Sequence, residues 1–217
     1  MKKLLLLFVF SVIYFGTQLS AQLSIRFGPE VGLQLASSSI KDDTLKIKGF
    51  IGPRFGGVVD IGVNDMISIQ PGVFWSTMGQ KIKGDDFFLG GSLDIAEKYS
   101  VLSVPIWINL KFGGDNKFFV GIGPEIDYVM SGYITGTIFG EDLTKEKIDL
   151  KDAEASRLLF SGNINLGYQT AMGLYFRANY NLGLTPIYKA TVSEFEKDYK
   201  FNNISLSVGW LFGGANN

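Results

Sequence analysis

The sequence predicts an all-β fold: an eight-stranded, antiparallel, up-and-down transmembrane β-barrel with a filled polar lumen. Three observations favour this fold. Apolar residues occupy every second position of eight segments, short and long connections alternate between the segments, and the remaining positions carry mostly small, amide or charged residues. An amphipathic helix would instead repeat its apolar residues every three to four positions. One membrane-embedded domain is therefore expected over residues 22–217.

Residues 1–21 are expected to form a cleaved secretory signal peptide. Lys2 and Lys3 provide its positive region, an apolar stretch follows, and Leu19-Ser20-Ala21 provides a small-residue cleavage site. The apolar stretch is shorter than the roughly 20 residues that a transmembrane helix needs. Without its two lysines the chain keeps 18 basic and 21 acidic residues, a net charge of −3.

The strands are predicted, in chain order, at residues 23–36, 50–63, 66–79, 99–113, 117–131, 157–170, 174–188 and 202–212. Each covers the 9 to 11 residues that cross a membrane as a strand. The first strand sorts its residues clearly by parity, with an apolar face of Ile25, Phe27, Val31, Leu33 and Leu35. The fourth is the most regular, with an apolar face of Leu102, Val104, Ile106, Ile108, Leu110 and Phe112. The last two strands repeat this pattern.

The connections between these strands differ in length on the two sides of the sheet. Tight turns are expected at Asn64-Asp65, Gly113–Asn116 and Met172-Gly173. The other connections are long, polar and charged: 37–49, 80–98, 132–156 and 189–201. Barrels of the bacterial outer membrane have short periplasmic turns and long external loops. We therefore expect the outer membrane as the location, periplasmic termini, and long loops on the outside.

Eight charged residues lie within the cores of the predicted strands, always on the parity opposite to the apolar one. They are four cations and four anions: Arg26, Arg54, Lys111, Arg177, Glu30, Asp60, Glu125 and Asp127. A balanced set suits a dehydrated lumen, where an unpaired charge costs several kcal/mol. These residues are predicted to form a structural charge network inside the barrel.

A soluble β-sandwich or lipocalin-like barrel is the main alternative fold. Such a protein also alternates, but it buries its apolar face and exposes its polar one. A solvated outer face would be rich in Lys and Glu, whereas the polar parity here is mostly Gly, Ser, Asn and Gln. Small and amide side chains suit the narrow interior of an eight-stranded barrel.

Aromatic and proline residues refine the expected strands. Trp75, Trp210, Phe212 and several tyrosines are predicted to form interfacial girdles; the tyrosines are Tyr128, Tyr168, Tyr180 and Tyr188. Trp107 falls on the polar parity and is expected to fill the lumen. All six prolines fall within predicted strands, so bulges are expected at Pro29, Pro53, Pro71, Pro105, Pro124 and Pro186.

Several short motifs resemble, in order, the outer-membrane β-barrel domain family of Bacteroidetes, the PorT-like group. They are Ser68-Ile-Gln-Pro-Gly-Val-Phe-Trp-Ser, Tyr99 to Phe112 with Val104-Pro105, Phe119-Val-Gly-Ile-Gly-Pro-Glu, Asn181-Leu-Gly-Leu-Thr-Pro-Ile and Leu206-Ser-Val-Gly-Trp-Leu-Phe. The resemblance implies an eight-stranded barrel with periplasmic termini. The aromatic residue expected near the C-terminus for the barrel-assembly machinery resembles Phe212, although five residues follow it. The resemblance does not imply the secretion role of PorT itself.

The composition excludes most familiar catalytic devices. The chain has no histidine and no cysteine, which rules out His- or Cys-based nucleophile systems and His or thiolate metal sites. No cofactor or metal is expected. No nucleic-acid partner is expected either, because a formal charge of −1 provides no basic excess. Glu125 and Asp127 share a strand face and could do acid–base work, but lumen pairing with the four cations is the preferred interpretation. The acidic pairs Asp42-Asp43 and Asp85-Asp86 are expected to be solvated rather than to bind Ca²⁺.

Three functions are compatible with the sequence. The preferred one is a non-enzymatic, monomeric barrel embedded in outer-membrane lipid, which acts as a structural or interaction module or as an accessory of envelope or secretion assemblies. A small transport pore or ligand-binding barrel is the alternative, and a membrane-embedded hydrolase is third. Within the loop 132–156, the stretch 140–156 carries a dense run of charges and is expected to be flexible or partly helical. Because long loops on rigid barrels carry function, it is the expected contact for a protein partner.

Overall fold

The computed structural model describes residues 24–38, 46–87, 91–138, 141–151, 155–188 and 199–213. The predicted signal peptide, residues 1–21, lies outside these ranges. The strands are β1 (Ser24–Ser38), β2 (Lys46–Gly62), β3 (Ile67–Phe87), β4 (Gly91–Gly113), β5 (Lys117–Ile138), β6 (Glu141–Ile148), β7 (Leu158–Gln169), β8 (Leu174–Gly183), β9 (Phe201–Trp210) and β10 (Phe212–Gly213). No helix within the described ranges is long and apolar enough to span a bilayer.

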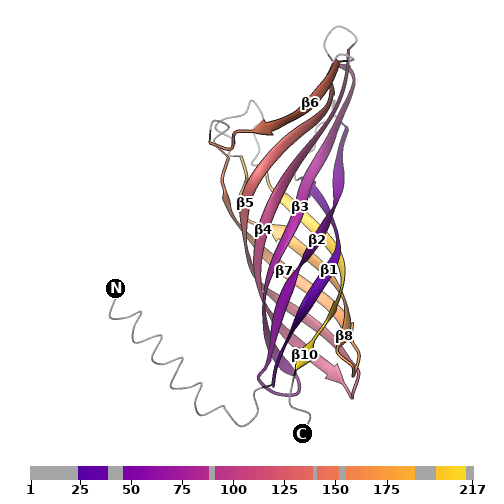
Figure 1. Cartoon of the computed structure of the whole chain (residues 1–217), viewed down its shortest axis with the longest axis vertical. Coiled ribbons are helices and arrows are strands. Elements are labelled where there is room, and N and C mark those ends of the chain that lie inside the picture. Colours follow the sequence, from indigo (N-terminus) through magenta and orange to yellow (C-terminus); the bar gives the residue numbers. More distant parts are fainter. Residues whose placement is uncertain are drawn as a thin grey trace, which may run out of the picture.

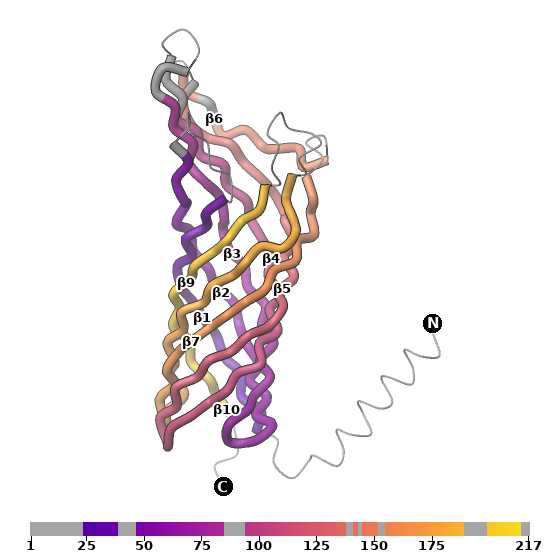
Figure 2. The backbone as a smooth tube through the Cα atoms, turned by 180° about the vertical axis from the view of Figure 1, so that it is seen from behind, coloured from indigo at the N-terminus to yellow at the C-terminus, as the bar shows by residue number. Residues whose placement is uncertain are grey.

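Eight of these strands close into one antiparallel barrel. The order is β1-β2-β3-β4-β5-β7-β8-β9, and β9 pairs with β1 to close the ring. The short β10 follows β9 and extends the same seam along β1. The strands tilt strongly around a tall cylinder (Figures 1 and 2). The eight-stranded up-and-down barrel is thereby confirmed, and β6 stands outside the ring because it pairs with β5 alone.

The tight turns gather at one end of the cylinder, where β1 begins and β10 ends (Figure 2). At the β2–β3 turn the side-chain oxygen of Asn64 accepts hydrogen bonds from the backbone N–H groups of Met66 and Ile67, at 2.9 and 2.7 Å. An Asn side chain that binds the backbone ahead of it is a usual way to stabilise such a turn. We call this the turn end and the opposite one the hairpin end.

At the hairpin end two predicted loops are strands. Most of 80–98 belongs to a long hairpin, since β3 runs to Phe87 and β4 starts at Gly91. The segment 132–156 is neither helical nor irregular over most of its length, because β5 continues to Ile138 and β6 folds back on it. The alternation pattern did not predict either hairpin, because strands above the membrane need no apolar face and these carry many charged residues. Figure 1 shows β6 leaning away from the top of the barrel.

The expected proline bulges are largely wrong. The ladders pass in register through Pro29, paired with Gly57, and through Pro105, paired with Glu125. Pro71 and Pro124 also pair in register, and Pro186 follows the end of β8. Only Pro53 coincides with a register shift, between β2 and β3. Other shifts occur where no proline stands, as at Ser100 and Val101.

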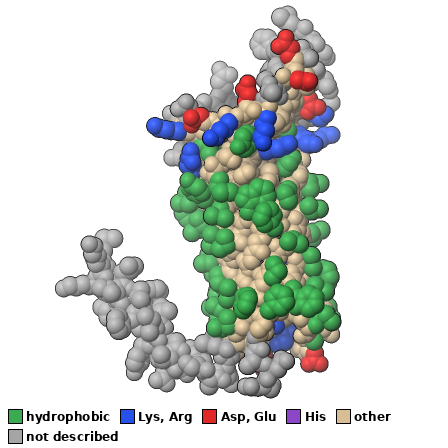
Figure 3. All heavy atoms as spheres, viewed as in Figure 1, with side chains coloured by type: hydrophobic (Ala, Val, Ile, Leu, Met, Phe, Trp, Pro, Cys, Tyr) green, Lys and Arg blue, Asp and Glu red, His purple; other side chains and the backbone are tan. Residues whose placement is uncertain are grey.

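The apolar parity faces outward and the polar parity inward. Phe27, Ile122 and Leu206 are 60%, 63% and 65% exposed, and they belong to an apolar belt around the barrel (Figure 3). A soluble barrel would bury these side chains, whereas lipid covers them in a membrane. Asp60 and Glu125, on the opposite parity, are buried.

Aromatic pairs mark the outer surface. Phe55 packs against Trp75 with ring centroids 4.9 Å apart, and Trp210 stacks on Phe212 at 6.1 Å. Trp107 is fully buried in the interior, as predicted. Tyr188 departs from its predicted girdle position. Its hydroxyl lies 3.1 Å from that of the buried Tyr99, so it covers the mouth of the barrel instead of facing lipid.

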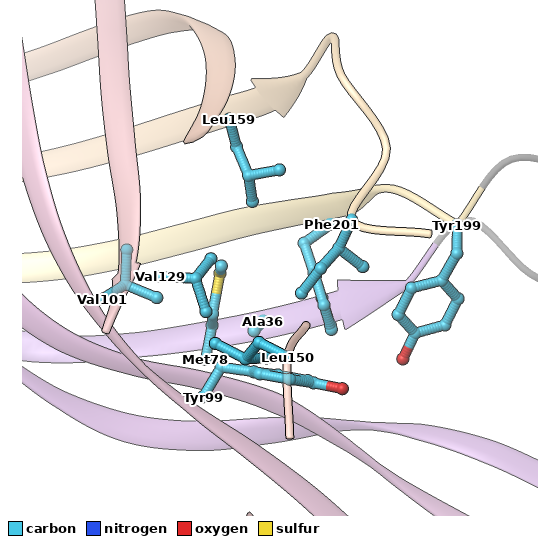
Figure 4. Packing of buried hydrophobic residues seen from close by; sticks show 10 residues of the cluster. Ala36, Met78, Tyr99, Val101, Val129, Leu150, Leu159, Tyr199 and Phe201 are labelled. Atoms are coloured by element: carbon cyan, nitrogen blue, oxygen red, sulfur yellow. The ribbon is translucent and has the colours of Figure 1, made fainter. Parts of the chain in front are cut away.

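An apolar cap closes the interior at the hairpin end. Its buried residues come from the upper parts of several strands and from the segments around Leu150 and Ile187 (Figure 4). We call this set the mouth cap: Ala36, Met78, Tyr99, Val101, Val129, Leu150, Leu159, Ile187, Tyr199 and Phe201. Backbone hydrogen bonds fasten it, with Ser156 N–H donating to the Ile187 carbonyl at 2.8 Å. The barrel is therefore apolar inside at its mouth, and below it the interior combines polar side chains with a second buried apolar cluster that includes Phe74, Trp107 and Phe119.

Candidate functional site

The lowest group of lumen charges lies near the turn end, around Asp60. Lys111 Nζ lies 2.8 and 2.7 Å from the two carboxylate oxygens of Asp60, and Arg26 Nη2 lies 2.8 Å from one of them. Arg26 and Asp60 are opposite each other on β1 and β2, while Lys111 reaches across the interior from β4. Asp60 and Lys111 are buried and Arg26 is partly exposed at the barrel end. One carboxylate thus holds two cations.

The middle group is built around Arg177. Its Nη1 lies 3.0 Å from Glu30 Oε2, and its guanidinium lies 4.1 Å from the centroid of Trp107. The Tyr175 and Ser207 hydroxyls each donate to Glu30 at 2.7 Å. Aromatic rings and a carboxylate therefore enclose the guanidinium, an arrangement that stabilises a buried cation.

The upper group is anionic in excess. Arg54 Nη2 lies 3.8 Å from Glu125 Oε2, and the Asn163 and Asn181 side-chain amides donate to Glu125 at 3.0 and 2.8 Å. Asp127 accepts hydrogen bonds from Ser103 and Ser161. No described cation forms a salt bridge with Asp127. The lumen therefore pairs its four cations with three of its four carboxylates.

All eight residues of the predicted charge network point into the barrel, and they form three groups rather than one. Neutral residues that sequence reasoning did not single out connect them. Gln70 is the chief example: its amide oxygen accepts from Arg177 and Asn109, and its nitrogen lies 3.4 Å from Asp60. The signal that could have identified Gln70 is its polar parity in β3, but it carries no charge to attract attention.

The interior is closed at the level of Gln70 and Arg177. The space beside Gln70, Lys111, Phe119, Tyr175 and Arg177 is too narrow to admit a water molecule. Above it, Phe74 packs edge-on against Trp107, and Arg54 lies 4.0 Å from the Phe74 ring centroid. Polar side chains in an eight-stranded barrel leave room for little else. The described interior is therefore filled around Arg177 and Trp107, and the mouth cap covers it at the hairpin end.

A further carboxylate lies at the mouth, where the sequence predicted only a loop. Glu97 of β4 accepts hydrogen bonds from the Tyr199 hydroxyl at 3.1 Å and from the Gln80 side-chain amide at 3.4 Å. It lies above the apolar belt. Burial raises the pKa of Glu97 above its usual value, and the two hydrogen bonds oppose this shift without cancelling it.

The possible metal sites find no support in the described residues. No three acidic side chains of the described part of the chain lie close enough together to hold a metal ion. Asp42 and Asp43 lie outside the described residues, and Asp85 and Asp86 belong to β3. Glu125 and Asp127 are enclosed by amides and hydroxyls in the filled lumen, so their geometry offers no cleft for a substrate.

Comparison with protein families matches residues 6–212 to the outer membrane protein beta-barrel domain. The chain belongs to this family of outer-membrane barrels. The match covers all the described strands except the last residue of β10, and it places the barrel domain in the outer membrane of a Gram-negative cell envelope. No curated protein matches the barrel domain.

Solved outer-membrane barrels resemble the barrel domain at low sequence identity. A major outer membrane protein from Thermus thermophilus has a TM-score of 0.47 and 12% identity, with 87% of this chain and 99% of that chain covered. Neisserial surface protein A has a TM-score of 0.43 and 13% identity, with 87% and 97% covered. The attachment invasion locus protein Ail of Yersinia pestis has a TM-score of 0.39 and 14% identity, with 86% and 98% covered.

Proposed function

We propose that this protein is a closed, non-enzymatic outer-membrane barrel that presents two hairpins on the cell surface for interaction. In this arrangement the turn end and both termini face the periplasm, after a signal peptide at residues 1–21 has been cleaved. The barrel-assembly machinery inserts the chain, which stays monomeric in the membrane. Its task is to hold the β3–β4 and β5–β6 hairpins rigidly above the outer leaflet.

The filled lumen is the observation that carries this proposal. A pore needs a continuous aqueous path, but aromatic rings and ion pairs occupy the interior here, and the mouth cap covers it. Removing one side chain would leave the others in place. The aromatic side chains and the charge network together keep the barrel closed, and the network holds the strands in register.

Single-channel recording in planar lipid bilayers tests the closed lumen. The wild-type barrel is expected to insert without any steady conductance, and Arg177→Ala is expected to stay closed because Trp107, Phe119 and Tyr175 still fill that level. Lys117→Ala, at the turn end outside the lumen groups, is the control. Stable conductance steps from the wild-type protein would support the transport-pore alternative and overturn the closed-barrel proposal.

The proposed orientation can be tested by cysteine labelling, because the chain has no native cysteine to interfere. Lys145→Cys places a thiol on β6 at the hairpin end, and Asp115→Cys places one in the β4–β5 turn. With a membrane-impermeant maleimide on intact cells, only the first should react. Labelling of the turn thiol alone would invert the proposed topology.

The β5–β6 hairpin is the best candidate surface for a protein partner. Among the described strands β6 pairs with β5 alone, so its second edge is free, and Glu141, Asp142, Lys145, Glu146 and Lys147 expose charged side chains. A free strand edge can pair with a strand from another protein. The resemblance to the PorT-like group stays a prediction, because the matching family describes only an outer-membrane barrel domain.

A shortened hairpin provides a direct test of this surface. Ile134 and Glu146 are already paired across β5 and β6, so residues 135–145 can be replaced by an Asn-Gly turn. The replacement removes the upper β5 residues that pair with 93–96 of β4, but it should keep the closure of the eight-stranded ring below them. Photo-crosslinks formed in intact cells from Glu141 of the full-length hairpin should identify a specific partner. The same probe at Asp115 is the control, and identical crosslinks from both sites would contradict a partner surface on this hairpin.

A further inference from the structure

Five lysines line the outer surface of the barrel at the hairpin end, directly above the apolar belt. We call them the lysine collar: Lys48, Lys81, Lys98, Lys145 and Lys147. All have solvent-accessible side chains, and Figure 3 shows basic side chains gathered in a band over the apolar surface. The collar extends from β2 to β6, across five neighbouring strands.

The strand register brings these lysines onto one face. Lys48 and Lys81 are direct partners across β2 and β3. Lys98 of β4 is the partner of Tyr133, which in turn is the partner of Lys147 of β6. Like charges directly opposite each other destabilise a strand pair unless an anion lies between them. A bare cationic row of this kind is therefore poised to receive anions.

Carboxylates do not neutralise the collar. None of its five ammonium groups forms a salt bridge with a carboxylate of the described residues. Nearby, Asp94 is paired with Lys83 at 2.6 Å rather than with a collar lysine. Glu97 is half-buried and accepts hydrogen bonds from Tyr199 and Gln80. Glu146 is exposed between Lys145 and Lys147 on β6, and it forms no salt bridge with either lysine.

The height of the collar matches the head-group layer of a bilayer. Ile51, 64% exposed, stands three residues below Lys48, and Leu102 stands four residues below Lys98. These steps correspond to about 10–13 Å along the strands. Two collar lysines also lie over aromatic rings, Lys98 at 5.3 Å from Phe50 and Lys145 at 4.3 Å from Tyr133. Such aromatic and basic neighbours are typical of a membrane interface.

We propose that the lysine collar binds the phosphate groups of lipid head groups in the outer leaflet. Phosphate suits this surface because ammonium groups bind it as point charges, and because several phosphorylated lipids can line a row of lysines side by side. The role in the cell rests on the proposed orientation, which places the hairpin end outside. Bound lipid would fix the depth of the barrel and hold the two hairpins at a constant height.

Native mass spectrometry of the folded, detergent-solubilised barrel tests the proposal. The probes are phosphatidic acid, phosphatidylcholine and inorganic phosphate. Wild-type protein should retain phosphatidic acid in preference to phosphatidylcholine, and the triple variant K48Q/K81Q/K98Q should retain it about tenfold less. The variant K117Q/K151Q/R157Q removes three basic charges outside the collar and is the matched control, expected to behave as wild type.

Each alternative outcome has a distinct signature. Equal loss in both triple variants would mean attraction by net charge alone, and retention of inorganic phosphate as strongly as of lipid would mean a free-anion site; either result overturns the proposal. Dimers that disappear only in the collar variant would assign this surface to a second copy and overturn it as well. Binding in detergent does not depend on the orientation of the barrel in the membrane. If the cysteine-labelling test contradicts the proposed orientation, the lipid-binding result still stands or fails by itself. Exposed substitutions should leave folding intact, which electrophoretic mobility of unheated samples verifies.

Discussion

Asp60 holds two cations inside the barrel, Lys111 and Arg26, and its removal should be among the most damaging single changes. Asp60→Asn leaves Lys111 buried without a countercharge, which is expected to lower the free energy of unfolding by about 3–5 kcal/mol. Urea titration in lipid vesicles, followed by tryptophan fluorescence, measures the change. The double variant Asp60→Asn/Lys111→Met should recover most of the loss, because the pair is then removed together. Additive losses would contradict this coupling.

Glu97 is the residue whose titration should be visible at the mouth. Its folded-state pKa lies above the unfolded value near 4.5, so the folded state binds the proton more tightly. The stabilisation is present below the unfolded pKa and is lost as the pH rises through the folded pKa. Hydrogen exchange of amides near Tyr188 and Tyr199 should therefore quicken between acidic and neutral pH, beyond the intrinsic pH dependence of exchange. In Glu97→Gln this additional change should disappear, and its persistence would assign it to another group.

The seam between β1 and the last strands depends on close backbone approach at Gly28. A Cβ added at Gly28 would lie 1.6 Å from the Trp210 carbonyl oxygen, whereas a Cβ at Gly162 would meet no atom within 4 Å. Gly28→Ala should therefore open the seam and lower stability by about 1–3 kcal/mol. Gly162→Ala is the matched control and should stay within about 0.5 kcal/mol of wild type. Urea midpoints of the two variants in vesicles make the comparison, and equal midpoints would contradict a tightly packed seam.

At the scale of elements, the alternating apolar pattern predicted the strands correctly where they cross the lipid, because lipid requires one apolar face. The six apolar positions from Leu102 to Phe112 define the membrane part of β4, but its extension to Gly91 has no such face, since water and not lipid surrounds it. The β5–β6 hairpin escaped prediction for the same reason. The prolines had the opposite effect, because they predicted bulges that the strands do not have. A proline removes a backbone N–H from one ladder only, so the strand can stay in register.

The whole barrel should behave as one cooperative unit in detergent. Closure through β1 and β9 leaves no free edge within the ring, so an unheated sample in SDS should migrate as a compact species and a boiled sample more slowly. Gel electrophoresis of outer-membrane fractions checks this. A shortened β5–β6 hairpin should preserve the shift because β6 is not part of the ring. Identical migration of heated and unheated wild-type samples would contradict a closed barrel.

The sequence by itself determined the strand period, the two faces, the tight turns and which charges belong to the interior. These properties follow from local geometry, because side chains alternate across every strand and lipid tolerates only one of the two sets. Only the tertiary structure decided which charges meet. Lys111 reaches Asp60 across the lumen, Arg177 meets Glu30 from a strand far away in the chain, and Asp127 receives hydroxyls in place of a cation. The stagger and closure of the strands set those distances, and no local pattern encodes them.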